Sequence, residues 1–410
     1  MKFFLFISRI LVGVVFVFSG FVKAVDPSGS AYKFSDYFSA FGLPFLEPLT
    51  IPLVIILSSA EFLIGISLLT GNRFRLGAWG LFIFMVFFTI LTFIIALTNP
   101  VTDCGCFGDA IIMTNWQTFY KNLILLPFVL LIFYNRNKQF ADRPVTTEWI
   151  LIGCFGILII GFQVINLRHL PPLDFRPYHI GSYIPDKMVI PEGEKPDEYK
   201  TFLYYEKDGN IEEFTEDNFP WEDTTWTFVE SKHVLVAKGF EPPIHDFTIT
   251  DRDGYDLTDH ILADNDYSYL LISSDIEKAN HEALLKANDM AAYCMAGNCS
   301  FYCLTSSTQE DAGNVAASLG IQFEFYTTDE ITLKTIIRSN PGLLLLKEGT
   351  IIDKWHFRDF IPVNQLNDNM LPGSIDRQRK LKERNYIFLA AGLLLLFFVS
   401  IGVFKIRPEV

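Results

Sequence analysis

The residues of this sequence best suited to chemistry are two cysteines, Cys104 and Cys106, in the string DCGCFGD at positions 103–109. Two thiols with one residue between them can close a small strained ring, or can act as a dithiol that exchanges with a partner, because strained and exposed disulfides are labile. The neighbouring glycines allow the tight turn that such a ring needs. Two alternatives stay open: bridges to cysteines elsewhere, or a soft metal site, for which two ligands alone are too few. The string predicts a redox-active or structural thiol pair.

Three ionisable side chains, Arg9, Lys23 and Glu61, lie within or at the end of strongly apolar segments. Ionisable groups inside a membrane are costly, and they are usually paired or functional. One interpretation is a structural ion pair, or a polar contact that fixes how the helices pack. The other makes Glu61 a proton-handling group or part of a polar cavity. Both interpretations predict a polar site within a membrane domain.

The elements that position these residues are apolar segments long enough to cross a bilayer, which takes about 20 residues. The chain has 410 residues, 50% of them hydrophobic and 20% charged, with a formal net charge of −14. An ordinary soluble protein has about 25% charged residues. Six candidate spans account for the difference: Phe3–Val22, Ile51–Thr70, Leu76–Leu97, Trp116–Tyr134, Trp149–Leu167 and Tyr386–Phe404.

Positive charge in the short loops predicts the direction of these spans, because cytoplasmic loops collect Lys and Arg. The loop after the second span carries Arg73 and Arg75, and the loop after the fourth carries Arg136, Lys138 and Arg143. The loop at 98–115 has neither residue type. We therefore expect a cytoplasmic amino terminus, with the loop at 98–115 and the region 170–384 exported into a compartment where disulfides persist.

One basic cluster contradicts this direction. It lies just before the last span, on the side predicted to be exported, and comprises Arg377, Arg379, Lys380, Lys382 and Arg384. Early spans usually dominate orientation, and large domains translocate largely regardless of charge. The predicted direction therefore stands, with the cluster unexplained.

The region 170–384 has 38 acidic and 20 basic residues, a balance of −18, so it differs in kind from the apolar remainder. A hairpin is predicted over 201–216, and Trp221, Trp226 and Phe228 after it have spacings that suit core aromatics. From about 242 to 360 the pattern alternates between strands and helices. The expected elements are strands at 244–250, 269–273, 301–305, 323–327, 342–347 and 351–356, and helices at 277–295, 311–319 and 330–338. This order predicts a mixed sheet with helices on both faces.

Three further cysteines lie in this α/β region. Cys299 and Cys303 are four residues apart on one predicted strand, which places them about 13 Å apart, so a direct bridge between them is not expected. A bridge between Cys294 and Cys299 is more plausible, with buried inert thiols as the alternative. The exported side would then hold five cysteines, an odd number, so at least one thiol stays unpaired or exchanges with a partner.

Two stretches beside the DCGCFGD string carry a family resemblance. They are RILVGVVFVFSGFVKAVDP at 9–27 and AEFLIGISLLTG at 60–71, and together with the string they resemble the DoxX/MauE family of four-helix membrane proteins over residues 1–140. The resemblance implies a membrane helical bundle with a role in extracytoplasmic thiol chemistry. DoxX-like proteins are associated with membrane sulfur or quinone redox chemistry, so the possible cofactor is a quinone. MauE-like proteins are associated with the maturation of methylamine dehydrogenase, but a methylamine substrate does not transfer.

The α/β region resembles the thioredoxin-like fold, in particular its peroxiredoxin and membrane-tethered TlpA-type branches. The strings HDFTITDRDGYDLTD at 245–259 and NPGLLLLKEGTIIDKW at 340–355 carry this resemblance, along with the element order. It places Pro341 at the position of the fold's cis-proline. The family's Cys-x-x-Cys belongs after the first core strand, where this chain has SSDIE at 273–277. Ordinary thioredoxin catalysis is therefore not expected.

The predicted fold class is a membrane α-helical bundle of four DoxX-like helices plus two further spans, joined to an extracytoplasmic α/β thioredoxin-like domain. The expected domains are a four-helix unit at 1–140, a fifth span at 149–167, an acidic β-rich linker region at 170–240, the thioredoxin-like domain at 242–362 and a last span at 386–404. The expected surroundings are the lipid of a bacterial inner membrane. With no basic stripe and no zinc-finger spacing, nucleic-acid binding has no support.

Three functional hypotheses follow. The first is extracytoplasmic thiol–disulfide redox chemistry or protein maturation, with Cys104 and Cys106 as the redox pair and the thioredoxin-like domain as a non-catalytic module that docks a protein client. The second is a non-enzymatic, membrane-anchored binding or assembly subunit. The third is a quinone-linked oxidoreductase subunit, which a quinone bound near Glu61 would support.

Overall fold

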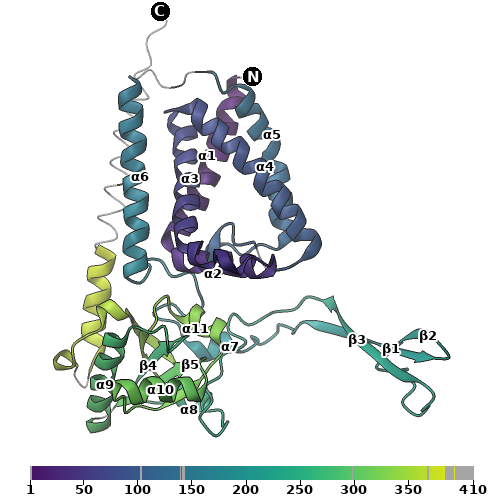
Figure 1. The fold of residues 1–410 in the computed structure, drawn as a ribbon, viewed down its shortest axis with the longest axis vertical. Coiled ribbons are helices and arrows are strands. Elements are labelled where there is room, and N and C mark those ends of the chain that lie inside the picture. Colours follow the sequence, from purple (N-terminus) through teal and green to yellow (C-terminus); the bar gives the residue numbers. More distant parts are fainter. Residues whose placement is uncertain are drawn as a thin grey trace, which may run out of the picture.

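The chain is described by a computed structural model that covers residues 2–101, 104–138, 140, 144–297, 299–366, 369–383 and 392. The predicted span Tyr386–Phe404 lies outside these described residues, apart from one glycine. Two bodies stand one above the other in Figure 1: a bundle of long helices, and an α/β unit below it.

Five helices of the bundle are long and apolar enough to cross a membrane. They are α1 (Lys2–Val25), α3 (Thr50–Thr70, preceded by the short η1 at Pro44–Leu49), α4 (Phe74–Thr98), α5 (Asn115–Tyr134) and α6 (Val145–Arg168). Each contains or closely matches one of the first five predicted spans. The chain is therefore a multi-pass membrane protein. The loops that carry Arg73 and Arg136 lie at the end of the bundle away from the α/β unit (Figure 1).

Helices α1 and α3 approach each other closely at glycines. A Cβ atom on Gly20 would lie 2.6 Å from the backbone N of Phe62 and the same distance from the backbone O of Ser58. A Cβ on Gly65 would lie 2.7 Å from the backbone N of Val17. Small residues at helix crossings allow such backbone contact inside membranes. The crossing brings the functional side chains of α1 and α3 within hydrogen-bond distance.

Helix α2 (Pro27–Ala40) lies across the end of the bundle that faces the α/β unit (Figure 1). This helix is not among the predicted elements. The helix forms because Asp26 caps it, accepting a hydrogen bond from the backbone N of Gly29 at 2.9 Å, and because Pro27 suits a first helical turn. It closes one end of the space between the spans.

The α/β unit has a five-stranded sheet in the order β6-β5-β4-β7-β8. Its strands are β4 (Tyr267–Ser273), β5 (Cys299–Thr305), β6 (Phe325–Thr327), β7 (Gly342–Lys347) and β8 (Thr350–His356). Strands β4, β5 and β6 are parallel, and β7 and β8 run antiparallel to them. The peptide bond between Asn340 and Pro341 is cis and directly precedes β7. This topology is thioredoxin-like, as predicted.

Helices cover both faces of the sheet, because successive strand residues point to opposite sides. Leu271 and Leu343 pack with α9 (His281–Ala296) and with α10 (Gln309–Leu319). Leu270 and Leu344 pack with α8 (Thr258–Leu262) and α11 (Glu330–Ile336). The predicted first strand at 244–250 is not a strand; only Thr250 makes isolated bridges there.

Residues from the predicted linker region belong to two different structures. Tyr178 and Ile184, the latter in α7 (Ile184–Met188), are buried in the core of the α/β unit. Residues 198–237 form a separate three-stranded antiparallel sheet in the order β2-β1-β3, which we call the arm; its strands are β1 (Glu198–Lys207), β2 (Asn210–Thr215) and β3 (Thr227–Ala237). Trp221 is 73% exposed and Phe228 is 52% exposed, so the prediction of core aromatics was wrong for these two, whereas Trp226 is half-buried and packs against Phe214.

The close approach at Gly20 generates a stability prediction. Gly20→Ala places a methyl group against the backbone of α3 and should destabilise the bundle by about 1–3 kcal/mol, the usual cost of overpacking. The matched control is Gly153→Ala on α6, where an added Cβ meets nothing within 4 Å. Thermal unfolding of the purified protein in detergent measures both variants. Equal melting temperatures for the two would contradict the close contact.

Candidate functional site

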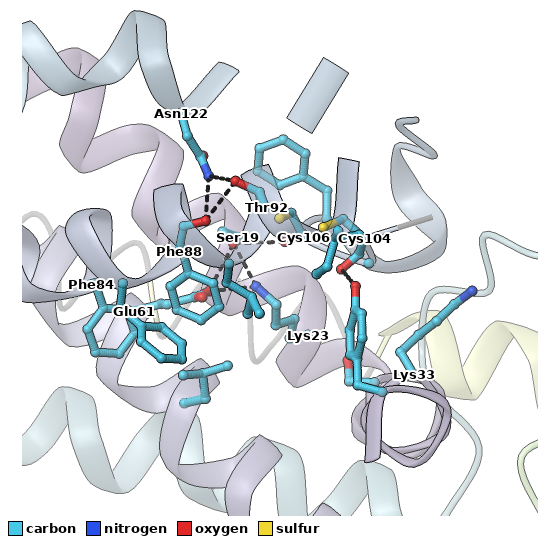
Figure 2. Close-up of a pocket in the computed structure, with 18 of the residues that line it drawn as sticks. Ser19, Lys23, Lys33, Glu61, Phe84, Phe88, Thr92, Cys104, Cys106 and Asn122 are labelled. Carbon is cyan, nitrogen blue, oxygen red and sulfur yellow. Dashed lines mark hydrogen bonds and ion pairs between the residues drawn. The ribbon is translucent and has the colours of Figure 1, made fainter. Parts of the chain in front are cut away.

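A cavity of about 410 Å³ lies inside the bundle, between α1, α3, α4 and α5. Helix α2 and residues 104–109, which we call the cysteine loop, lie at one end of it. Its walls are mostly apolar and aromatic, with Phe16, Phe84, Phe88 and Leu125 among them. Polar groups gather where the cysteine loop meets the helices, as Figure 2 shows. The cavity therefore combines an apolar body with one polar end.

Cys104 and Cys106 line this polar end, and neither is in a disulfide. Their backbone carbonyls anchor the loop. The Tyr37 hydroxyl on α2 donates to the Cys104 carbonyl at 2.9 Å, and the Ser19 hydroxyl on α1 lies 2.9 Å from the Cys106 carbonyl (Figure 2). Because the backbone makes these contacts, the two thiols stay available for chemistry.

The two thiols differ in acidity. A hydrogen bond from the Cys104 thiol, helped by the positive charges of Lys121 and Lys23, outweighs burial and lowers the pKa of Cys106 to about 6. The same hydrogen bond, together with burial, raises the pKa of Cys104. At neutral pH Cys106 is therefore a thiolate, the nucleophilic form, while Cys104 keeps its proton.

Lys23 and Glu61 form a buried ion pair beside the thiols. The Lys23 Nζ lies 2.7 Å from Glu61 Oε2, and each side chain is 9% exposed. Lys23 also donates to the Ser19 hydroxyl at 2.8 Å, and that hydroxyl lies 2.9 Å from Glu61 Oε2. Ser19 thus joins the ion pair to the backbone of Cys106. Both sequence-based interpretations of Glu61 fit, since it is paired and also lines the cavity.

Arg9 does not belong to this site, although we grouped it with Lys23 and Glu61 from the sequence. Fourteen residues of α1 separate Arg9 from Lys23, about 21 Å along a helix. Arg9 instead donates to the Leu68 carbonyl at 2.8 Å and lies over the ring of Phe140, 3.8 Å from its centroid. Its contacts fix the packing of α1 against α3 at the other end of the bundle.

A contact that the sequence did not predict joins the α/β unit to the cysteine loop. Arg338 follows α11, and its guanidinium lies 2.8 Å from Asp26 Oδ2 and 3.0 Å from Asp109 Oδ2. The side chain is only 7% exposed. Burial alone would raise the pKa of Asp26, but Arg338 and Arg176 lower it below its usual value, so Asp26 is ionised. Asp109 is the last residue of the DCGCFGD string, which is the one sequence signal that pointed here.

The thioredoxin-like site around Pro341 carries hydroxyl and amide groups in place of thiols. The Ser273 hydroxyl donates to Asn340 Oδ1 at 2.7 Å, and Asn340 Nδ2 donates to the Asp275 carbonyl, also at 2.7 Å. The backbone N of Ile276 donates to the Ser307 hydroxyl. These bonds tie the end of β4 to the cis-proline loop.

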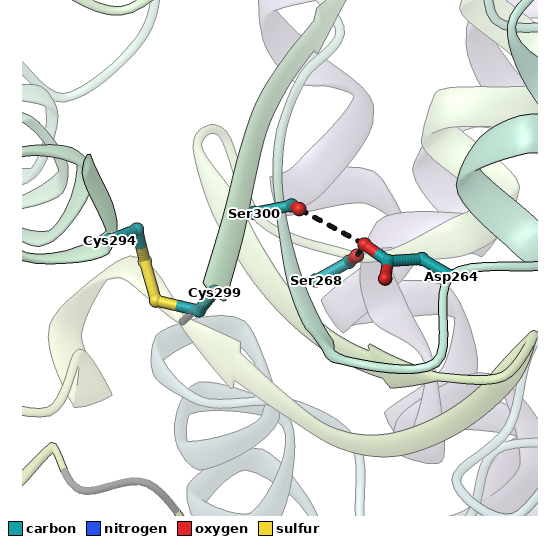
Figure 3. Close-up of a disulfide and its surroundings, with 5 residues drawn as sticks. All are labelled: Asp264, Ser268, Cys294, Cys299 and Ser300. Atoms are coloured by element: carbon teal, nitrogen blue, oxygen red, sulfur yellow. Dashed lines mark hydrogen bonds between the residues drawn. A yellow bond between two sulfur atoms is a disulfide. The ribbon is translucent and has the colours of Figure 1, made fainter. Parts of the chain in front are cut away.

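Cys294 and Cys299 form a disulfide between the end of α9 and the start of β5, the pair that the sequence favoured (Figure 3). Cys299 lies opposite Tyr267 at the start of β4, whereas Pro341 lies beside the end of β4. Strands of seven residues separate these ends by about 20 Å. Cys303 is buried, and burial raises the pKa of its thiol. Neither the disulfide nor Cys303 belongs to the site at Cys104 and Cys106.

No group of three or more His, Cys, Asp or Glu side chains converges as a candidate metal site within the described ranges. The cavity has the size and polarity to bind an organic molecule.

Comparison with known proteins gives a family match for the amino-terminal part. Residues 1–135 match the family described as methylamine utilisation protein MauE. This stretch, which holds α1 to α5, is a MauE-type domain, and α6 lies outside the match. The DoxX part of the resemblance stays a prediction. Residues 199–238, which are the arm, match a domain of unknown function, DUF8463. A comparison with curated proteins gives no match.

Three solved structures are similar to the α/β part. One is a candidate thiol:disulfide interchange protein DsbE from Chlorobium tepidum, with 16% identity, a TM-score of 0.24, and coverage of 32% of this chain and 92% of that one. Another is a candidate protein disulfide isomerase from Bacteroides thetaiotaomicron, with 14% identity, a TM-score of 0.24, and coverage of 34% and 89%. The third is a mutant of Xylella fastidiosa PrxQ, with 12% identity, a TM-score of 0.20, and coverage of 34% and 89%. The fold assignment rests on the strand order and the cis-proline.

The hydrogen bond between the thiols generates a prediction about acidity. Cys104→Ala removes the donor and should raise the pKa of Cys106 from about 6 toward the about 8.5 of an ordinary thiol. Cys104→Ser keeps a donor and should leave the pKa much closer to that of the parent. The pH dependence of Cys106 alkylation by iodoacetamide, read by mass spectrometry, measures both. If the two variants gave the same profile as the parent, the hydrogen bond would not set the pKa.

Proposed function

We propose that the protein is a membrane thiol–disulfide oxidoreductase in which Cys104 and Cys106 are the redox pair. The observation that carries the proposal is geometric: two cysteines outside any disulfide, one residue apart, line the polar end of a cavity within the membrane domain, where the pKa of Cys106 is lowered and that of Cys104 is raised. A thiolate beside a protonated thiol is the arrangement that thiol–disulfide exchange requires.

The exchange reaction has two steps. The Cys106 thiolate attacks a disulfide of a client protein, forming a mixed disulfide and releasing one client thiolate. Cys104 loses its proton and attacks the Cys106 sulfur, which releases the second client thiolate and leaves a Cys104–Cys106 disulfide. In the opposite direction a client dithiol becomes a disulfide and the pair becomes a dithiol. The partner is accordingly an exported protein with exchangeable thiols.

In the oxidising direction the pair passes on two electrons, while the two protons come overall from the client dithiol, and we assign the role of acceptor to a lipid-soluble quinone. The residues of the cavity fit such a molecule. Aromatic walls, including Phe84 and Phe88, suit a flat ring, and the ammonium group of Lys121 could donate to a carbonyl oxygen. A quinone would supply a two-electron sink within the bilayer. Glu61, through Lys23 and Ser19, would hold or transfer the proton that the thiols release.

In the same proposal, the cysteine loop and the α/β unit lie on the extracytoplasmic side of a bacterial inner membrane. The basic loops at Arg73 and Arg136 lie at the opposite end of the bundle, which supports a cytoplasmic position for that end. The Cys294–Cys299 disulfide supports an oxidising compartment for the α/β unit.

A reconstituted assay tests the redox role. In liposomes with decylubiquinone and reduced ribonuclease A, the full-length protein should oxidise the ribonuclease thiols while the quinone is reduced in equal amount. Cys106→Ser, Cys104→Ser and the double variant should each lower the rate at least about 100-fold, since no covalent exchange can be completed. Cys303→Ser is the matched control and should keep the rate. Undiminished activity of the double variant would contradict the proposal.

The quinone assignment has its own prediction. Glu61→Gln should slow quinone reduction more than it slows exchange between the pair and glutathione disulfide, because that exchange needs no proton transfer through the cavity. Both rates are measured on the same liposomes. If the pair exchanges with ribonuclease and glutathione but no quinone is reduced, the quinone assignment fails and the redox role stands.

A further inference from the structure

The edge of the α/β sheet that faces the membrane domain carries Arg338 and Pro341. The parallel strands β4, β5 and β6 all end at this edge, and β7 begins there with Gly342 opposite Ile272. Arg338 lies three residues before Pro341, in the same connection. This edge points toward α2 and the cysteine loop (Figure 1). It has hydroxyl and amide groups where the family resemblance places thiols, so its contribution must come from what it contacts.

One guanidinium on this edge holds two segments of the membrane domain. Its Nε contacts Asp26 at 2.8 Å and its Nη2 contacts Asp109 at 3.0 Å, while Nη1 donates to the carbonyl of Lys334 on α11. The guanidinium also lies over the ring of Tyr32 on α2, 5.3 Å from its centroid. The planar fork of an arginine is suited to such simultaneous contacts with carboxylates.

Both contacted segments lead directly to the thiols. Asp109 is three residues after Cys106, at the end of the loop that holds both cysteines. Asp26 caps α2, and Tyr37 on the same helix donates to the Cys104 carbonyl. Asp26 also lies three residues after Lys23, whose charge acts on Cys106. One side chain of the α/β unit therefore fixes the two segments that determine where Cys104 and Cys106 lie.

We propose that Arg338 is a positioning residue of the Cys104/Cys106 site, through which the thioredoxin-like domain keeps the cysteine loop and α2 closed over the cavity. The domain serves the thiol pair without thiols of its own at this edge. The position of the loop sets the distances from Cys106 to Cys104, Lys121 and Lys23. Losing Arg338 leaves two partly buried carboxylates without their shared partner, and they would separate toward water.

The test uses the full-length protein in nanodiscs and reads thiol acidity and access, so it does not depend on the proposed redox function. Arg338→Ala should move the midpoint of Cys106 alkylation from about pH 6 toward the about 8.5 of a free thiol. It should also raise the labelling rate of Cys104 by a membrane-impermeant maleimide by at least about 10-fold. Arg338→Lys keeps the charge but not the planar fork of the guanidinium. Its alkylation midpoint and labelling rate should lie between those of the parent and of Arg338→Ala.

The matched control is Lys334→Ala. Lys334 lies over the same Tyr32 ring at 5.0 Å, and its ion pair is with Glu330 on its own helix, at 2.6 Å. This variant should keep the parent's pH profile and labelling rate. Retention of the Cys294–Cys299 disulfide, checked by mass spectrometry, shows that the α/β unit of each variant has folded.

A second route avoids any loss of folding in the Arg338 variants. Asp109→Asn keeps the size of the side chain and removes its charge, and it should shift the Cys106 midpoint in the same direction. When Arg338→Ala and Asp109→Asn are combined, the shifts of the Cys106 midpoint should not add, because both substitutions break the same contact. An unchanged Cys106 profile in folded Arg338→Ala, or in Asp109→Asn, would overturn the proposal. A shifted profile in a protein that oxidises no ribonuclease would uphold the positioning role and reject the redox function.

Discussion

The buried guanidinium of Arg338 links the two bodies of this protein. It lies between Asp26 at the start of α2 and Asp109 at the end of the cysteine loop. The Tyr37 hydroxyl on α2 donates to the Cys104 carbonyl, and the Ser19 hydroxyl on the spanning helix α1 lies 2.9 Å from the Cys106 carbonyl. The closed end of the cavity therefore depends on a residue that belongs to the α/β unit. This dependence explains how a thioredoxin-like domain without a Cys-x-x-Cys can still take part in thiol chemistry.

Residues with a strong local signature could be predicted from the sequence. The first five spans follow from hydropathy, because a bilayer requires long apolar helices. The α/β order and Pro341 followed from the element pattern and the resemblance. The partner of Glu61 could not be chosen between Arg9 and Lys23, since only helix packing decides it. The contact of Arg338 with Asp109 was also missed, because it joins residues far apart in the chain. Helix α2 was missed as well, although its start signals, Asp26 and Pro27, are local.

The basic cluster that contradicted the predicted membrane direction has a structural use. Arg377 lies 3.0 Å from Asp353, whose side chain is fully buried, and its guanidinium lies 4.9 Å from the centroid of the Trp355 ring. Arg379 and Lys380 pair with Asp376 one turn away. These contacts give Arg377, Arg379 and Lys380 a structural role in the α/β unit, whatever their effect on orientation.

Two pairs of cysteines stand apart in this protein. Cys104 and Cys106 lie at a membrane cavity and differ in the pKa of their thiols, whereas Cys294 and Cys299 form a disulfide about 20 Å from the docked edge of the sheet. The most direct test of the redox role is the state of the Cys104/Cys106 pair in native membranes, trapped with acid and a permeant maleimide while the quinone pool is shifted. The pair should be a disulfide when the pool is oxidised and a dithiol when it is reduced, with Cys294–Cys299 oxidised throughout. A pair that stays in one state under both conditions would contradict it.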